Sequence, residues 1–317
     1  PEPYRFETAM PRYIFTSIGL LLFALGGLDA VCATTLYVDN MRGDDRFDGL
    51  SERNAGGAQG PVRTIDRALR IASHGDRVVI ANTGEPYRES ISLYGNRNSG
   101  HPELPFLIEG NGAILDGAAP IDHRAWRHVR GNLFRFRPTA ISYQQLYSDG
   151  VPLEKIDVDP ARPLIPQLKP GQWCVLGDHI YLLVDDGRLP IDYALSHTAR
   201  QTGVTIYSVR NVIVTDLVVQ GFRLDGVNVH DLSRDVLLSG ITARGNARSG
   251  VSVGGSSHAR LAGSVIGDNG AAQVRTEEYG LLEVIETELI DNTAPKWRVD
   301  GGRLIIDDKP VSPAPSP

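Results

Sequence analysis

A unit of 23 or 24 residues that recurs along the second half of the chain constrains the fold more than any other feature of the sequence. Hexapeptides that align with one another begin at Gly203, Gly226, Gly250, Gln273 and Lys296. They read GVTIYS, GVNVHD, GVSVGG, QVRTEE and KWRVDG, and each is followed by a second apolar run such as VIVTDLVV or VLLSGITA. Repeats of this length, built from short strands, are typical of solenoid proteins.

Two solenoid architectures have periods of this length, the leucine-rich repeat and the parallel β-helix. The leucine-rich repeat needs a fixed Leu framework with an Asn inside it, which these units lack. Val, Ile and Leu instead alternate with polar residues, as expected for strands with one face in a narrow core and the other in solvent. Asn246, Asn269 and Asn292 recur one period apart, and we expect their amides to stack. We therefore predict an all-β fold, a right-handed parallel β-helix formed by a single chain.

Length and charge are consistent with one solenoid and argue against some partners. The chain has 317 residues, with 32 Lys and Arg against 38 Asp and Glu, and a formal net charge of -6. This mild acidity argues against a nucleic-acid partner, which requires a basic surface. The cysteines are Cys32 and Cys174, so the core rather than a disulfide framework must hold the fold. We expect a monomer.

Residues 1–33 have the pattern of an export signal. Arg12 precedes the apolar run YIFTSIGLLLFALGGL, and VCA at residues 31–33 is a small-residue cleavage pattern. Met10 is the first Met and a candidate start of translation. A retained membrane anchor is the alternative, but the apolar run is short for a span. We expect cleavage, a secreted or periplasmic protein, and no stable membrane association afterwards.

Residues 34–118 are predicted to form an N-terminal cap and the first coils. Apolar side chains recur there at helical spacing before Gly75, so a short capping helix is expected. These side chains belong to Ile65, Ala68, Leu69 and Ala72. TLYVDNMRGDDRFDGLS followed by GPVRTIDRALRIASHGDRVVIANTGEPYRESISL also resembles the opening of pectate-lyase-like parallel β-helix proteins. The resemblance implies the fold and says little about the reaction.

An acidic loop before this helix is a candidate calcium site. It carries Asp39, Asp44, Asp45 and Asp48. Hard cations bind several carboxylates at once, so the cluster makes Ca²⁺ the candidate cofactor. The alternative is that Asp and Gly here serve the turns of the loop itself.

Residues 119–200 break the period, and the coils are expected to resume over residues 201–308. The intervening segment contains Trp126, Trp173 and hairpin-like runs such as QQLYSDGVPLE and WCVLGDHIYLLVDDG, so we predict a small β-rich insert. Its aromatic side chains form either a sugar-binding wall or a satellite core. The Pro-rich residues 309–317 are predicted to be a disordered tail.

The fixed period aligns side chains of successive coils into columns. One column is predicted to point inward: Val204, Val227, Val251, Val274 and Trp297. The next residue of each unit is expected to face solvent: Thr205, Asn228, Ser252, Arg275 and Arg298. A second outward column lies two residues further along the same face: Tyr207, His230, Gly254, Glu277 and Asp300. Gly254 is expected to leave a notch between His230 and Glu277.

The two outward columns form the best candidate site in the sequence. We assign catalysis to His230, Arg275, Glu277 and Asp300, and substrate contacts to Tyr207, Asn228, Arg248 and Arg298. An extended strip suits a linear polymer, and Arg pairs well with planar carboxylates. Together with the family resemblance, this pattern predicts a polysaccharide partner of acidic type, such as a polyuronate.

A lyase is one function that the strip allows. It requires a base beside a uronate carboxyl group and a cation that stabilises the enolate. No Lys lies among residues 203–293, which leaves Arg275, Arg248 or His230 as the base.

A hydrolase and a protein without catalytic activity are the alternatives. A hydrolase would use Glu277 and Asp300 as a carboxylate pair about one rung apart. A non-catalytic strip would bind a glycan, or would be a polar surface whose ion pairs contribute under ~1 kcal/mol each. Asp225 and Asp231, at the two ends of one predicted strand, are interpreted as turn residues.

Overall fold

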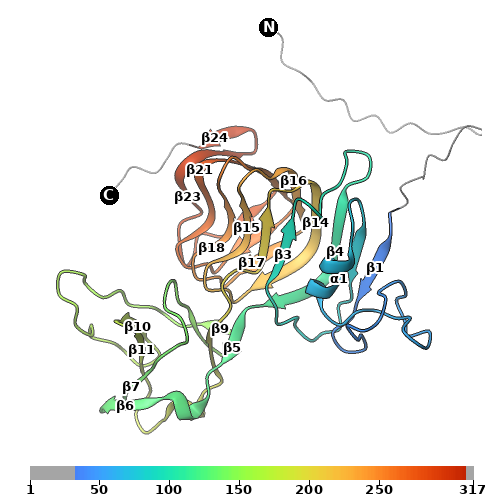
Figure 1. The fold of residues 1–317 in the computed structure, drawn as a ribbon. Coiled ribbons are helices and arrows are strands. Elements are labelled where there is room, and N and C mark those ends of the chain that lie inside the picture. Colours follow the sequence, from blue (N-terminus) through green and yellow to red (C-terminus); the bar gives the residue numbers. More distant parts are fainter. Residues whose placement is uncertain (1–32, 312–317) are drawn as a thin grey trace, which may run out of the picture. The chain divides into compact units, whose positions relative to one another are not determined.

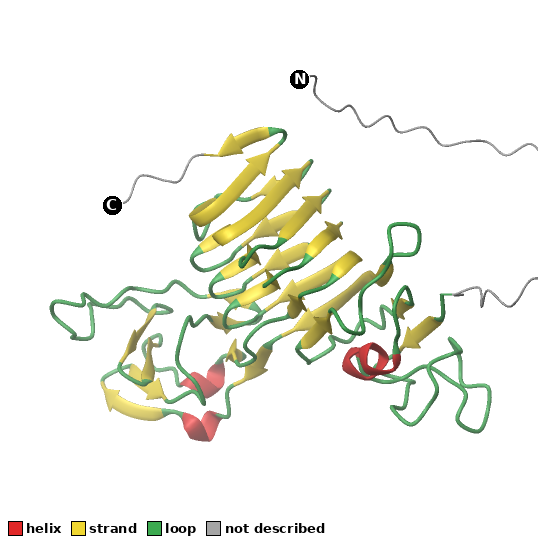
Figure 2. Ribbon diagram, turned by 45° about the horizontal axis from the view of Figure 1, so that its top comes forward, coloured by secondary structure: helices red, strands yellow, loops and turns green. Residues whose placement is uncertain are grey.

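The chain winds into a stack of coils made of parallel strands (Figure 1). The computed structural model describes residues 33–311, so residues 1–32 of the predicted export signal and residues 312–317 of the predicted tail lie outside the described range. Sixteen strands join one sheet that curls around a common axis, and Figure 2 shows its coils stacked one above another. The predicted all-β parallel β-helix is confirmed.

One face of the coils, the first face, carries the repeated hexapeptides. It consists of β3 (Ile91–Tyr94), β13 (Val204–Tyr207), β15 (Asp225–His230), β18 (Ser249–Val253) and the first parts of β21 (Ala272–Ile285) and β23 (Trp297–Ile306). Val204, Val227, Val251, Val274 and Trp297 pair successively along it, as the spacing predicts. The valines are fully buried, so this column points inward as expected.

Two further faces complete each coil. The second face contains β1 (Thr35–Val38), β2 (Arg77–Ile80), β4 (Phe106–Asp116), β14 (Arg210–Gln220), β16 (Arg234–Ser239), β19 (His258–Ala262) and the later parts of β21 and β23. The third face continues from the ends of β4 and β14 through β17 (Thr242–Arg244), β20 (Val265–Gly267) and β22 (Glu288–Leu289). Asn111 and Asp216 bend β4 and β14 between these faces with φ of 51° and 49°, a conformation that short polar side chains tolerate.

A ladder of buried amides runs through the corner between the third and the first face. The amide nitrogen of Asn246 donates to Asn269 Oδ1 at 3.0 Å, which confirms the predicted stacking of these two residues. Asn269 in turn donates to Gln273 Oε1 at 2.9 Å. Gln273 therefore takes the third buried place, whereas Asn292 is exposed and meets the ladder only through a 3.4 Å contact with Gln273.

We expect Asn269→Ala to lower the free energy of unfolding by about 2–3 kcal/mol, because several buried backbone groups lose a hydrogen-bond partner. The Asn269 amide donates to the carbonyls of Ala243 and Gly267, and its oxygen accepts the backbone N–H of Asn246. Urea unfolding followed by circular dichroism measures this loss. Asn292→Ala is the matched control and should change stability by less than ~0.5 kcal/mol, since its side chain is exposed. Equal losses in both variants would contradict a structural role of the buried ladder.

The predicted capping helix is α1 (Ile65–Ile71). Thr64 caps its N-terminus by accepting a hydrogen bond from the backbone N–H of Arg67. Ile65 and Leu69 are buried in the same hydrophobic core as the valines of the coils, so the helix covers apolar side chains of the first coil. No helix within residues 33–311 is long and apolar enough to cross a membrane.

The predicted β-rich insert lies between β4 and β13 and forms two antiparallel sheets. One contains β5 (Ala118–Pro120), β12 (Leu195–Thr198), β8 (Leu146–Ser148) and β9 (Val151–Pro152), and the other contains β10 (Trp173–Leu176), β11 (His179–Leu183), β7 (Leu133–Phe136) and β6 (Arg127–Arg130). Short 3-10 helices, η1 (His123–Ala125) and η2 (Pro190–Asp192), connect them. Trp126 and Trp173 are buried in a core of the insert's own, so they form the satellite core and not a sugar-binding wall.

The last coil ends in a hairpin where the composition predicts the start of a disordered tail. β24 (Lys309–Val311) pairs antiparallel with β23, so ordered structure continues past the predicted end of the coils at Asp308. Asp307 and Asp308 make the turn with φ of 45° and 63°, as a two-residue turn of type I′ requires. Asp-Asp is a weaker hairpin signal than Asp-Gly, which explains the wrong boundary.

Candidate functional site

The second outward column lies on the first face and is longer than the repeat predicts. We call the series Tyr94, Tyr207, His230, Gly254, Glu277 and Asp300 the site column. Tyr94 extends it, because Tyr94 at the end of β3 pairs with Tyr207. The rings of Tyr94 and Tyr207 lie 6.4 Å apart, and those of Tyr207 and His230 lie 6.3 Å apart. The run ISLY, which ends in Tyr as VTIY does, is the sequence signal for Tyr94.

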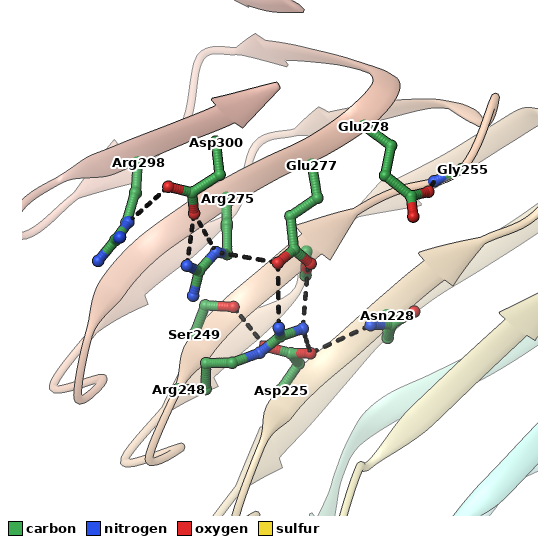
Figure 3. Close-up of polar contacts among 11 residues, drawn as sticks. Asp225, Asn228, Arg248, Ser249, Gly255, Arg275, Glu277, Glu278, Arg298 and Asp300 are labelled. Atoms are coloured by element: carbon green, nitrogen blue, oxygen red, sulfur yellow. Dashed lines mark hydrogen bonds and ion pairs between the residues drawn. The ribbon is translucent and has the colours of Figure 1, made fainter. Parts of the chain in front are cut away.

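The other end of the site column is a network of carboxylates and guanidinium groups (Figure 3). Arg275 lies between the two carboxylates: its Nε is 2.7 Å from Asp300 Oδ2 and 3.3 Å from Glu277 Oε1. Arg298 donates from Nε to Asp300 Oδ1 at 2.8 Å. Arg248 reaches Glu277 Oε1 from Nη1 at 3.2 Å. The predicted catalytic pair Glu277 and Asp300 is thus in register on neighbouring strands, with cations on both sides.

Arg248 also pairs with a carboxylate beneath the network. Its Nε and Nη2 bind Asp225 at 2.9 Å and 2.5 Å, a bidentate arrangement. Asp225 has no exposed surface and also accepts from Ser249 Oγ and from Asn228 Nδ2. The interpretation of Asp225 as a turn residue is therefore wrong. Asp231 fits that interpretation, because its φ is 69° at the corner after β15.

The first outward column is less exposed than alternation predicts. Ser252 has no exposed surface and Arg275 is 6% exposed, although both were expected to face solvent. Two side chains close over Ser252. Glu277 Oε2, from the next coil, lies 3.2 Å from its Oγ, and Arg248 Nη2, from the same coil, lies 3.5 Å from it. Arg298, in the last coil, remains half exposed.

Pairing with opposite charges favours the ionised forms of Asp300 and Arg248. Burial raises the pKa of Asp300, but hydrogen bonds from Arg298 and Arg275 outweigh it and hold that pKa below its ordinary value. Burial lowers the pKa of Arg248, yet the bonds to Asp225 outweigh it and raise that pKa above its ordinary value. A guanidinium in such pairs does not release its proton, so Arg248 is unsuited to the role of a lyase base. His230 is exposed and remains the candidate for a lyase base on this face.

An open pocket of about 420 Å³ lies at the centre of the site column. It is lined by Asn228, His230, Arg248, Gly254, Glu277, Glu278 and Asp300. Glu278 forms the bulge after Glu277 with φ of 54°, and its carboxylate accepts the backbone N–H of Gly255 at 2.6 Å. The predicted notch at Gly254 is the floor of this pocket. Five of the eight catalytic and substrate-contact candidates from the sequence thus meet around one hollow, whereas Tyr207, Arg275 and Arg298 do not line it.

The aspartates of the N-terminal loop do not share a common site. Asp39 and Asp48 accept backbone N–H groups of their own turns, Asp44 pairs with Arg46, and Asp45 accepts from Thr64. In the part of the chain that the structure describes, no group of three or more His, Cys, Asp or Glu side chains is arranged to hold a metal ion. Each of these carboxylates serves turn or cap chemistry here, which fits the alternative reading of the loop, and the calcium site stays a prediction.

Comparisons with known proteins show that this chain is similar in fold to several solved structures. No family model and no curated protein matches the chain. A solved structure described as the complex of XylC with xylose is 11% identical over 84% of this chain and 65% of its own, with a TM-score of 0.43. A glycoside hydrolase is 10% identical over 78% of this chain and 68% of its own, with a TM-score of 0.55. A GH136 lacto-N-biosidase from Eubacterium ramulus is 12% identical over 86% of this chain and 50% of its own, with a TM-score of 0.40.

These similarities extend only to architecture. The chain spans 65% of the length of the XylC structure and half of the lacto-N-biosidase. The glycoside hydrolase has a TM-score above one half and shares the fold. At these identities a shared fold leaves the reaction open, because one fold hosts many functions.

Proposed function

We propose that this chain is a carbohydrate-active β-helix protein of the pectate-lyase-like superfamily, which binds a glycan along the site column and hydrolyses a glycosidic bond at its central pocket. The observation that carries the proposal is the carboxylate pair Glu277 and Asp300, which is in register and lines the pocket. The neighbouring rings of Tyr94 and Tyr207, which we call the aromatic platform, lie further along the same column. The fold shared with a glycoside hydrolase supports a carbohydrate substrate. In this proposal residues 1–33 direct the export of the chain, and the chain acts after export.

The geometry suits a retaining mechanism. Residues paired on adjacent strands lie about 4.8 Å apart, and retaining enzymes hold their carboxyl groups about 5–5.5 Å apart. Asp300 has the shorter contacts to cations, 2.7 and 2.8 Å, so it stays ionised and acts as the nucleophile. Glu277, on the neighbouring rung, has longer contacts to cations, 3.2 and 3.3 Å, and we assign it the role of acid and base.

The remaining residues of the site column bind the glycan. Tyr94 and Tyr207, 52% and 42% exposed, offer ring faces on which sugars stack. Asn228 and His230 present polar groups to sugar hydroxyls at the pocket. Binding along the coil axis lets a linear glycan contact several rungs at once.

The charge balance of the site favours a neutral glycan over the acidic polymer expected from the sequence. Arg248, Arg275 and Arg298 are each paired with carboxylates of the same network. Glu278 adds a negative charge at the pocket. Because carboxylates of the network already neutralise these guanidinium groups, a uronate carboxylate would gain less from pairing with them.

Hydrolysis is tested by incubating the protein with neutral glycans and polyuronates and measuring two products. New reducing ends without ultraviolet absorbance of an unsaturated sugar are expected from neutral glycans. Absorbance of the unsaturated product would instead indicate a lyase with His230 as its base. No product from any glycan in the panel would contradict hydrolysis.

Glycan binding without catalysis is the second candidate. The observation that favours it is the network itself, because Glu277 and Asp300 are both paired with arginines. Retention of a glycan by an affinity gel, with no product formed, would support this function.

A further inference from the structure

Gly254 has no evident role in building the backbone. Its φ lies outside the left-handed region, and a Cβ there would meet no backbone atom among its nearest neighbours. Every other glycine of residues 33–311 either has φ between +20° and +160° or would bring a Cβ within 3.0 Å of another atom. The next residue shows the contrast, because Gly255 has φ of 61° and its Cβ would lie 2.5 Å from the Asp231 carbonyl oxygen.

The missing side chain instead shapes the pocket. A Cβ at Gly254 would lie 3.3 Å from His230 Nδ1 and 3.7 Å from Glu277 Cβ, so it would occupy the space between these side chains. His230 and Glu277 stand on the coils before and after Gly254, and their side chains lean toward each other over it, so His230 Nδ1 and Glu277 Cβ lie no more than about 7 Å apart. A slot of this width takes one layer of atoms, such as the edge of one sugar ring.

We propose that the Gly254 notch is the subsite that admits one sugar ring, and that glycine at this position sets the specificity for a neutral ring with an unsubstituted edge. This inference rests on the proposed function and deepens it. The pocket around the notch is lined by the carboxylates of Glu277, Glu278 and Asp300 and by the guanidinium of Arg248, and this excess of negative charge disfavours an anionic substituent. Its narrow floor excludes a ring with a bulky acyl group on the inserted edge.

The notch is tested with the full chain on an array of neutral, uronate and sulfated oligosaccharides. Wild-type protein is expected to bind neutral oligosaccharides, and Gly254→Ala to bind them at least about tenfold more weakly, a loss of roughly 1.4 kcal/mol. The melting temperature should not change, because exposed His230 can shift to accept the methyl group. Ala262→Leu adds bulk to the same coil on the second face and should leave binding unchanged.

The outcomes separate this inference from the proposed function. If Tyr207→Ala weakens binding but Gly254→Ala does not, the proposal for the notch is overturned and the proposed function stands. A lower melting temperature of Gly254→Ala would show that this glycine serves the fold and would also overturn it. Preference of the wild-type protein for sulfated or uronate oligosaccharides would overturn the specificity proposed here. Failure of the wild-type protein to bind any oligosaccharide would overturn both proposals.

Discussion

Arg248→Met is expected to lower the free energy of unfolding by about 3–5 kcal/mol, the usual cost of leaving one partner of a buried ion pair unpaired. Asp225 has no exposed surface, and Arg248 is its cationic partner. Met keeps an unbranched apolar stem like that of Arg, so the loss in stability comes mainly from leaving the Asp225 carboxylate unpaired. Equilibrium unfolding in urea at neutral pH measures it.

Two further variants isolate this effect. Arg260→Met removes an exposed pair with Glu283 on the second face and should cost less than ~1 kcal/mol. Asp225→Asn combined with Arg248→Met removes both charges and should recover part of the stability lost by Arg248→Met alone. Similar losses for Arg248→Met and Arg260→Met would mean that the buried pair contributes no more than a surface pair.

The repeat was enough to predict the coils and the alignment of the site column. A shift of one residue would turn the valines out of the core, so the spacing of Val204 and Val227 determines the pairing of the strands. The same register places Tyr207 beside His230 and Glu277 beside Asp300 without further information. The buried stacking of Asn246 on Asn269 follows from it as well.

The burial of polar side chains was not predictable from the repeat. Alternation indicates which way Ser252 and Arg275 point, but not that side chains of neighbouring coils cover them. Asp225 looks like a turn residue until Arg248, a full coil later in the sequence, is seen to reach it. Such contacts depend on side-chain conformations between rungs, which leave no periodic signal. For the same reason, the sequence does not predict single exceptions to the repeat, such as the place that Gln273 takes in the ladder instead of Asn292.

Glu277→Gln is expected to reduce kcat for hydrolysis by about 10²–10⁴-fold, the contribution of a positioned general acid and base. Gln has the same shape but cannot carry the proton to the leaving group. KM should change little, since the aromatic platform of Tyr94 and Tyr207 still binds the glycan. Initial rates of reducing-end release over a range of substrate concentrations measure both constants.

A structural effect of the same substitution must be distinguished from a chemical one, because Glu277 also contacts Arg248 and Arg275. Glu283→Gln, on the second face, is the matched control and should keep the wild-type kcat. The adjacent-rung spacing of Glu277 and Asp300 further requires that the first product retain the anomeric configuration of the substrate, which proton NMR reads directly. A product of inverted configuration, or a Glu277→Gln protein that folds normally and keeps its rate, would remove Glu277 from the catalytic pair.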